Sequence, residues 1–255
     1  MCLVENLLVL YPHGLGDCIL LTPAIREFHK ATGHKVHVAT LQRFESAKFF
    51  DNNPYVDKIF YTKDAWHDYP NSHVGFSELY KEWKTFAQKN SFGGIVMPMH
   101  SHPVSKIELN FKFLGVQNPQ NYKAEIHTTQ KDVDKAASII SSVVGEQPFG
   151  FIQTNTGVEQ KDLPQGYGEQ WLKNNKNLEA FIEVGKNFSA LEHNINVQFE
   201  IMRKASAVCL PDSVFYHACH AMNKPVDLAY FGRGKGVYER VKHTVASKEK
   251  VVFEL

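Results

Sequence analysis

The stretch Gly14-Leu-Gly-Asp-Cys-Ile-Leu-Leu-Thr-Pro23 follows closely on the apolar run Leu7-Leu-Val-Leu-Tyr11. That run is apolar on both faces, which is typical of a parallel strand that helices cover on each side. Gly14 and Gly16 permit a sharp turn, and the residues from Leu20 to Thr32 predict the helix that comes next. This order of strand, glycine loop and helix predicts an α/β fold, in which ligands bind beyond the carboxyl ends of the strands.

The acidic residue of this loop, Asp17, has two interpretations. A carboxylate there repels phosphate, so Asp17 suits a general base that accepts a proton from a neutral hydroxyl group. Asp is also a favoured N-cap residue of helices. The loop by itself supports a catalytic base and a helix cap equally.

The composition is that of a globular protein with balanced charge. Its 255 residues are 43% hydrophobic, enough for one large or two small domains, and the net charge is +1. A charge so near zero gives no sign of broad nucleic-acid binding. The sequence contains no long apolar span or signal peptide, and its four cysteines lack Cys-x-x-Cys spacing, so we expect a cytoplasmic protein with reduced thiols.

Strands and helices alternate along the chain, which predicts parallel sheets with helices on both faces. A polar, irregular segment at 118–129 is the best candidate for a linker, and the apolar run 148–154 predicts the strand that opens a second domain. We therefore expect two Rossmann-like domains, an N-terminal domain over 1–146 and a C-terminal domain over 147–255.

Three short motifs near the amino end carry a family resemblance. They are Gly14-Leu-Gly-Asp17, Leu21-Thr-Pro-Ala24 and Asn53-Pro-Tyr-Val-Asp57. In order and spacing they resemble the amino-terminal half of glycosyltransferase family 9, the heptosyltransferase-like enzymes. The resemblance implies a GT-B-like fold with two doubly wound domains facing a cleft, with Asp17 as the general base of an inverting transfer. It also places Gly14, Leu15 and Gly16 on the substrate-binding side.

Two histidines follow another expected strand of this half. His100 and His102 come after the apolar run 94–99, at a strand end that faces the same crevice as Asp17 if the sheet is wound as expected. We expect them to position the hydroxyl or phosphate of an acceptor. A metal site is the weaker alternative, because alternate residues of a strand point to opposite faces and no third ligand is identifiable.

The loop that follows the strand at 148–154 is rich in hydrogen-bond donors. It contains Thr154, Asn155 and Thr156 and extends to Lys161. Hydroxyl groups, free amides and a lysine charge suit the phosphates of a nucleotide diphosphate, so we expect these four residues to bind a donor. The alternative is an ordinary polar loop with a solvated lysine. The family resemblance favours the donor site, because the family has a small-residue loop and then a lysine at this strand end.

A further motif lies in the C-terminal half. A strand ends at Asp212 and Ser213, and His217 follows four residues after the serine. This resembles the family's donor-site signature, with Val214 in place of the usual glycine. The helix amides, Ser213 and His217 are therefore expected to hold the diphosphate, with Asp212 beside them. Ser213 as a simple helix cap and His217 as a buried structural histidine are the alternatives.

Part of the family pattern is missing from the C-terminal domain. Between Trp171 and Asn196 the sequence favours one helix, around 178–188, where the family usually has a further helix and strand. We therefore expect a shortened second domain. The tail after Gly234 predicts a helix followed by a strand.

Together with these patterns, the resemblance to family 9 implies an inverting, metal-independent glycosyltransferase without a cofactor. It would move a heptose or another hexose-like sugar from a nucleotide-diphosphate sugar to the hydroxyl of a glycan, glycolipid or other acceptor, with peripheral membrane contact left open. A zinc site at Cys209, His217, Cys219 and His220 is disfavoured, because His217 and Cys219 lie on different sides of a helix. The alternatives are an inactive nucleotide- or glycan-binding protein of the same fold and a nucleic-acid-modifying glycosyltransferase.

Overall fold

The chain folds into two compact units, Met1–Tyr122 and Lys123–Leu255. The computed structural model describes residues 5–99, 104–156, 159–184, 194–242 and 249–253. The division falls inside the polar segment 118–129 that the sequence marks as a linker. Helix α4 (Gln130–Val143), which the sequence prediction placed in the first domain, packs against α6 (Ile195–Lys204) and so belongs to the second unit.

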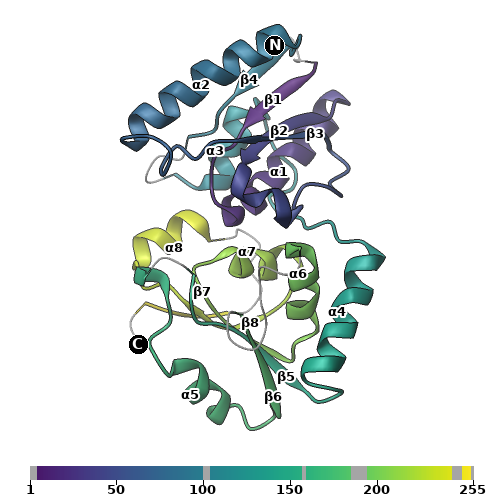
Figure 1. Cartoon of the computed structure of the whole chain (residues 1–255), viewed down its shortest axis with the longest axis vertical. Coiled ribbons are helices and arrows are strands. Elements are labelled where there is room, and N and C mark those ends of the chain that lie inside the picture. The colour runs from purple at the N-terminus through teal and green to yellow at the C-terminus, as the bar shows by residue number, and fades with distance from the viewer. Residues whose placement is uncertain (1–4, 100–103, 157–158, 185–193, 243–248, 254–255) are drawn as a thin grey trace. The chain divides into compact units, whose positions relative to one another are not determined.

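The first unit is a parallel sheet with the strand order β3-β2-β1-β4. The chain adds β2 and β3 on one side of β1 and then returns to place β4 on the other side (Figure 1). Between β1 and β4 the winding reverses, and ligands of open α/β sheets bind at such a reversal. The elements are β1 (Leu7–Leu10), α1 (Leu15–Thr32), β2 (Val36–Leu41), the short 3-10 helix η1 (Gln42–Ala47), β3 (Val56–Thr62), α2 (Ser72–Lys89), β4 (Gly94–Val96) and α3 (Lys106–Phe113).

Alternation along β1 sends its side chains to two helical layers. Leu8 and Leu10 pack against α2, in a buried cluster with Leu79 and Trp83. Trp83 is fixed there because its Nε1 donates a hydrogen bond of 2.8 Å to the Thr62 hydroxyl at the end of β3. Helices α1 and α3 contact one another and cover the other face. The sheet between these layers is a rigid base for the loops at its carboxyl edge.

Helix α1 begins at Leu15, five residues earlier than the predicted start at Leu20. Pro23 lies inside the helix and cannot donate to the carbonyl of Ile19. The Thr22 hydroxyl donates to that carbonyl instead, over 2.8 Å. Because the freed acceptor is satisfied in this way, the helix tolerates the proline and extends back to the glycine loop.

The second unit is a five-stranded parallel sheet with the order β6-β5-β7-β8-β9. Its winding reverses between β5 and β7, so a binding site is expected where these two strands end. Helix α5 covers one face, while α4, α6 and α7 lie on the other. The remaining elements are β5 (Phe149–Gln153), the short 3-10 helix η2 (Glu159–Lys161), α5 (Tyr167–Asn174), β6 (Ala180–Val184), β7 (Ala207–Pro211), α7 (Val214–Ala221), β8 (Val226–Tyr230), α8 (Lys235–Val241) and β9 (Glu249–Val252).

The helix predicted around 178–188 is wrong, because Ala180–Val184 is strand β6. It pairs in parallel with β5, with Ile182 opposite Phe151. A short apolar run does not distinguish strand from helix, and here the β-branched and aromatic residues fit the open edge of β5. The helix and strand predicted for the tail are confirmed as α8 and β9.

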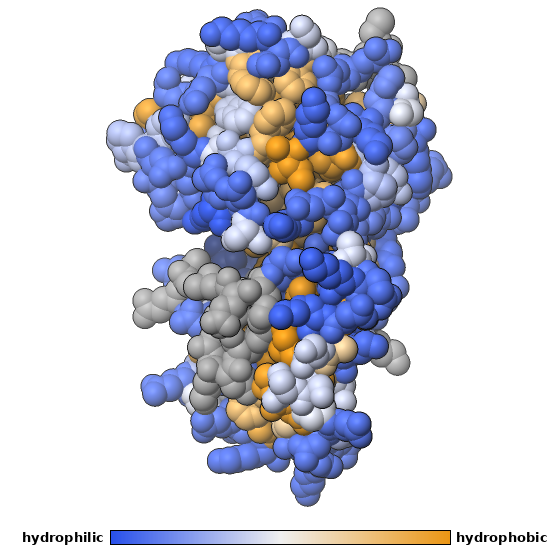
Figure 2. All heavy atoms as spheres, turned by 45° about the vertical axis from the view of Figure 1, so that its right-hand side comes forward, coloured by the Kyte–Doolittle hydropathy of each residue, from blue (hydrophilic) through white to orange (hydrophobic). Residues whose placement is uncertain are grey.

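The visible surface is mainly polar. Figure 2 shows hydrophilic residues over most of one face of each unit, with apolar residues confined to limited areas. Among the residues that the structure describes, the large apolar side chain with the greatest exposure is Trp66, at 59%. In the part of the chain that the structure describes, no helix combines the length and the apolar character that crossing a membrane requires.

Candidate functional site

The site of the first unit lies where β1 and β4 end side by side. His13, three residues beyond β1, donates from Nε2 to the carbonyl of Pro98 beyond β4, over 2.8 Å. Its ring is buried between Tyr11 and Phe76. Burial lowers the pKa of His13 despite the nearby charge of Asp17, so the imidazole is neutral at pH 7 and ties the two strand ends together.

Asp17 is the third residue of α1, and the N-cap position belongs to Gly14. The cap interpretation of Asp17 is therefore wrong. Its Oδ1 lies 2.5 Å from Nζ of Lys106, the first residue of α3. A lysine at the start of a helix is opposed by the helix dipole, so the contact with Asp17 compensates an otherwise unfavourable position. The two side chains are 20% and 19% exposed, so the pair is partly open to solvent.

Neutral groups hold the backbone of this loop in place. The Tyr11 hydroxyl donates to the carbonyl of Asp17 over 3.1 Å. Asn110 of α3 donates to the Tyr11 hydroxyl over 3.3 Å and to the carbonyl of Leu20 over 3.0 Å. Burial and the charge of Asp17 raise the pKa of Tyr11 well above its ordinary value, so the phenol stays protonated. The arrangement presents one partly exposed carboxylate beyond the end of β1, with one of its oxygen atoms held by an ammonium.

The other residues predicted for this side are placed as follows. Gly14, Leu15 and Gly16 form the N-cap and first turn of α1, directly before Asp17. Gly14 has φ −62° and ψ 159°, which other residues also adopt, so its backbone does not require glycine. The predicted acceptor residues His100 and His102 lie outside the described residues.

The site of the second unit is centred on Asp212, which follows β7 and is 4% exposed. Its Oδ2 lies 3.0 Å from Nζ of Lys161 and 3.0 Å from a guanidinium nitrogen of Arg233. Lys161 also donates to the Asp212 carbonyl over 3.1 Å. Burial raises the pKa of this carboxyl, but Lys161, His217 and Arg233 outweigh burial and hold the pKa of Asp212 below its ordinary value. A buried anion thus fixes two cations at the carboxyl ends of β5, β7 and β8.

Ser213 occupies the N-cap position of α7, but its side chain makes no capping hydrogen bond. Its Oγ atom is buried and has no hydrogen-bond partner among the residues that the structure describes. Ser213 is thus the N-cap residue that the alternative interpretation expected, but its hydroxyl does not cap the helix. His217 lies one turn into α7, is 4% exposed and contacts the ring of Tyr216. This environment suits an anion. It combines the buried Ser213 hydroxyl with the first amides of α7 and the two cations, Lys161 and Arg233.

Sequence reasoning missed Lys106 and Arg233. A Cβ atom at Gly232 would lie 2.5 Å from the carbonyl oxygen of Gln160, so the segment after β8 lies directly against η2. This close approach brings Arg233 to the carboxylate that Lys161 holds. The available signals were a basic residue just beyond the pair Phe231-Gly232, which follows β8, and a lysine soon after the apolar run 94–99.

The predicted donor residues of the β5 loop are placed beside carboxylates. Thr154 donates its hydroxyl proton to Glu183 over 2.7 Å. The Thr156 amide and hydroxyl both donate to Asp162, over 2.6 and 2.8 Å. Phosphate oxygens only accept hydrogen bonds, so in this arrangement the two threonine hydroxyls have no proton to offer a diphosphate.

The same loop borders a pocket of about 490 Å³. Its wall includes Thr154 and Asn155 together with the carboxylates of Asp162, Glu169 and Glu183, and no lysine or arginine is among its lining residues. A pocket of this charge suits hydroxyl groups that donate hydrogen bonds and disfavours phosphate. In the described part of the chain, no three His, Cys, Asp or Glu residues are grouped so as to hold a metal ion.

Solved glycosyltransferases have the same arrangement of elements. The glycosyl transferase family 9 structure from Veillonella parvula DSM 2008 matches with a TM-score of 0.69 at 14% identity, covering 99% of this chain and 87% of that chain. This chain has a GT-B-like glycosyltransferase fold. ADP-heptose LPS heptosyltransferase II of E. coli matches this GT-B-like chain with a TM-score of 0.70 at 11% identity, covering 97% of this chain and 90% of that chain.

A third match is E. coli heptosyltransferase WaaC with ADP-2-deoxy-2-fluoro heptose, with a TM-score of 0.61 at 12% identity, covering 97% of this chain and 93% of that chain. No protein-family model and no curated protein matches the sequence. The fold expected from the resemblance to family 9 is therefore confirmed by structures at low identity.

Proposed function

We propose that this GT-B-like protein is an inverting glycosyltransferase that uses a nucleotide-diphosphate sugar. Asp17 accepts the proton of an acceptor hydroxyl, and the hydroxyl oxygen attacks the anomeric carbon of the donor sugar. The bond from that carbon to the diphosphate breaks, and its electron pair leaves with the phosphate oxygen. Lys106 supports this role because its ammonium group holds the Asp17 carboxylate in one position beside the glycine loop.

The leaving diphosphate is assigned to the second unit. The Ser213 hydroxyl and the first amides of α7 donate hydrogen bonds, while Lys161 and Arg233 supply positive charge. Asp212 keeps both cations in place before the donor arrives, so little reorganisation accompanies binding. Because two protein cations meet the developing charge, we propose that transfer needs no metal ion.

The observation that carries this proposal is the unsatisfied Ser213 hydroxyl. A buried hydroxyl without a partner is costly by about 1–3 kcal/mol, so its presence calls for an explanation such as a bound ligand or an ordered water. It lies at the start of α7, next in sequence to the residue that Lys161 and Arg233 contact. An incoming phosphate oxygen would satisfy it.

The neighbouring acidic pocket is assigned to a hydroxyl-bearing part of the donor. Asp162 lines this pocket and directly follows Lys161 in the chain, so the pocket adjoins the segment that carries this cation. Glu183 and Glu169 accept hydrogen bonds from hydroxyl groups. In this proposal Thr154 and Asn155 contact the hydroxylated part of the donor rather than its phosphates.

Thermal unfolding with a panel of ADP-, GDP-, UDP-, CMP- and TDP-linked sugars, in the presence of a chelator, tests the proposal. ADP-heptose is the first compound of the panel, because two of the matched structures are an ADP-heptose LPS heptosyltransferase and a heptosyltransferase with ADP-2-deoxy-2-fluoro heptose. A ligand at ~100 times its dissociation constant adds about 2.7 kcal/mol to the free energy of unfolding. For a protein of this size that corresponds to an increase in Tm of roughly 5–11 °C.

An increase in Tm with one nucleotide series under chelation supports the donor site and names the base. Absence of any increase across the panel contradicts it. A nucleotide sugar could also raise the Tm without being consumed, whichever acceptor hydroxyl is offered. That result supports the alternative of a binding protein without transferase activity.

A further inference from the structure

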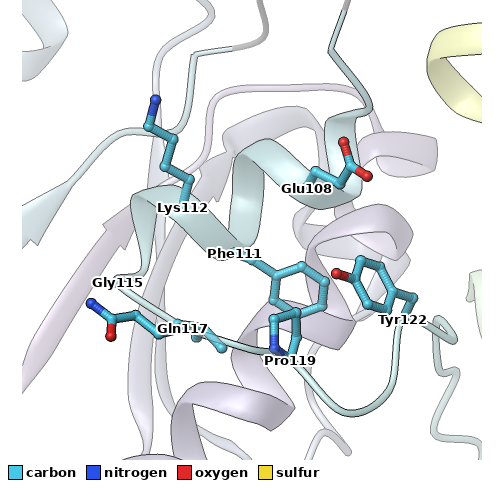
Figure 3. A pocket seen from close by; sticks show the side chains of 8 residues that line it. Glu108, Phe111, Lys112, Gly115, Gln117, Pro119 and Tyr122 are labelled. Carbon is cyan, nitrogen blue, oxygen red and sulfur yellow. The ribbon is translucent and has the colours of Figure 1, made fainter.

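A second pocket, of about 360 Å³, lies on the first unit along α3 and the loop that follows it. This volume is within the range of about 300–1,000 Å³ that is typical of small-molecule sites. Figure 3 shows the rings of Phe111, Pro119 and Tyr122 gathered at its floor and side. Phe111 and Tyr122 meet edge to face, with ring centroids 5.0 Å apart.

The loop that forms this pocket is fastened to α1 by a buried ion pair. Arg26 and Glu27 are 2% and 5% exposed, with Nε and Oε1 3.0 Å apart. Arg26 donates to the carbonyl of Asn121 over 2.6 Å, and Glu27 accepts from the amide of Gln120 over 3.2 Å. The backbone between Pro119 and Tyr122 is therefore held by charged groups, so the pocket is preformed rather than a chance depression in a loose loop.

Two charged side chains line the pocket. Glu108 and Lys112 are four positions apart on α3, the spacing at which such a pair usually interacts. The side chains nevertheless make no ion pair or hydrogen bond with other residues in the part of the chain that the structure describes. Figure 3 shows the Glu108 carboxylate on the side of Tyr122 and the Lys112 side chain extending away from it.

We propose that this pocket binds one neutral sugar ring of the acceptor glycan, as a subsite separate from the Asp17 loop. A pyranose offers an apolar C–H face, which packs on the rings of Tyr122 and Pro119. Its hydroxyl groups donate hydrogen bonds, so they can satisfy the Glu108 carboxylate, which lies on the side of Tyr122. The proposal rests on the proposed function for the statement that the glycan is an acceptor; binding of the ring itself does not depend on transfer.

Saturation-transfer difference NMR with simple methyl glycosides tests the subsite. The probes are methyl α-D-glucopyranoside, methyl α-D-mannopyranoside and methyl α-D-galactopyranoside, with glycine as a zwitterion that carries both charges without an apolar face. The proteins are the full chain and its Tyr122→Ala and Glu108→Gln variants. Glu146→Gln is the matched control, because Glu146 is an exposed carboxylate of the second unit.

At least one glycoside is expected to receive saturation from the wild-type chain and from the Glu146→Gln control. Tyr122→Ala is expected to weaken binding by about 3- to 10-fold, the loss of one aromatic contact, and Glu108→Gln to weaken it as well. Glu108 is exposed, so its variant folds even if the loss of the contact between Phe111 and Tyr122 disturbs the other variant.

Three outcomes overturn the subsite. They are no saturation of any glycoside, unchanged binding in both pocket variants, and saturation of glycine alone. The nucleotide-sugar panel is repeated on Glu108→Gln, and an unchanged increase in Tm there shows that loss of the subsite is distinct from failure of the donor site.

Discussion

The Nζ atom of Lys106 lies 2.5 Å from Oδ1 of Asp17, although 89 positions separate the two residues. The contact exists because β4 lies next to β1 in the sheet, so that the helix after β4 begins beside the helix after β1. The first unit therefore positions its candidate base, Asp17, with an ion pair between the helices that follow β1 and β4. The expected consequences for activity and stability can be measured separately.

Asp17→Asn is expected to lower kcat by a factor of about 10²–10⁴, the usual contribution of a general base. The increase in Tm with the nucleotide sugar should not change, because the donor site belongs to the second unit. Turnover with saturating donor and acceptor measures the first effect. Asp51→Asn, at an exposed carboxylate of the same unit, is the control and should retain full turnover. Near-normal turnover of Asp17→Asn contradicts the assignment of the base.

The ion pair itself is expected to contribute modestly to stability. Both side chains are about one-fifth exposed, so solvent screens the pair and its coupling should be about 0.5–2 kcal/mol. A double-mutant cycle with Asp17→Asn and Lys106→Met, followed by urea unfolding, measures this coupling free energy. Additive effects of the two substitutions would show that the contact does not stabilise the fold.

Gly232→Ala is expected to lower the free energy of unfolding by about 1–3 kcal/mol, because the added Cβ would lie 2.5 Å from the Gln160 carbonyl oxygen. Gly14→Ala is the matched control, since its nearest contact would be an ordinary 3.9 Å and its φ is −62°. Its expected loss is below about 1 kcal/mol. Thermal or urea unfolding compares the two variants. Equal losses would mean that the segment after β8 does not lie against η2.

The ion pairs of Asp212 are expected to make stability dependent on pH in the acidic range. The folded-state pKa of Asp212 lies below the ordinary value of 3.8, so the unfolded state binds the proton more readily. The contribution of the Asp212 carboxylate to the free energy of unfolding is complete above pH ~4. It is lost as the pH falls through the folded-state pKa of Asp212. The difference in free energy of unfolding between wild type and Asp212→Asn should therefore be constant near neutral pH and shrink below pH ~4.

Asp134→Asn, at an exposed carboxylate of α4, is the control for this titration. Its difference from wild type should stay small across the whole range. A difference for Asp212→Asn that stays constant down to pH ~2 would contradict the depressed pKa of Asp212.

The sequence identified the residues that lie within a few positions of a strand end. Asp17, Asp212, Ser213 and His217 follow strands that hydrophobic runs reveal, and the structure places all four at carboxyl edges. Lys161 was found in the same way, because the loop that carries it leaves β5 directly.

Residues whose position depends on tertiary contact could not be predicted in this way. Lys106 reaches Asp17 only through the neighbouring positions of β1 and β4, and Arg233 reaches Asp212 only because Gly232 lies against Gln160. Strand β6 was mistaken for a helix because a short apolar run has no period of its own, and pairing with β5 decides its structure. Likewise, hydrogen bonds to carboxylates give the threonines of the β5 loop a different environment from the one that their residue types predict.

The most direct test compares Ser213→Ala with Ser206→Ala in the nucleotide-sugar panel. The Ser213 hydroxyl has no partner among the described residues, so its removal should leave the Tm of the ligand-free protein unchanged or slightly higher. Ser206, an exposed residue directly before β7, is the matched control at the opposite end of the same strand. Our account predicts that Ser213→Ala loses about 1–3 kcal/mol of ligand stabilisation, while Ser206→Ala keeps the wild-type increase in Tm. Equal increases in Tm for the two variants would contradict the assignment of the donor phosphates to this site.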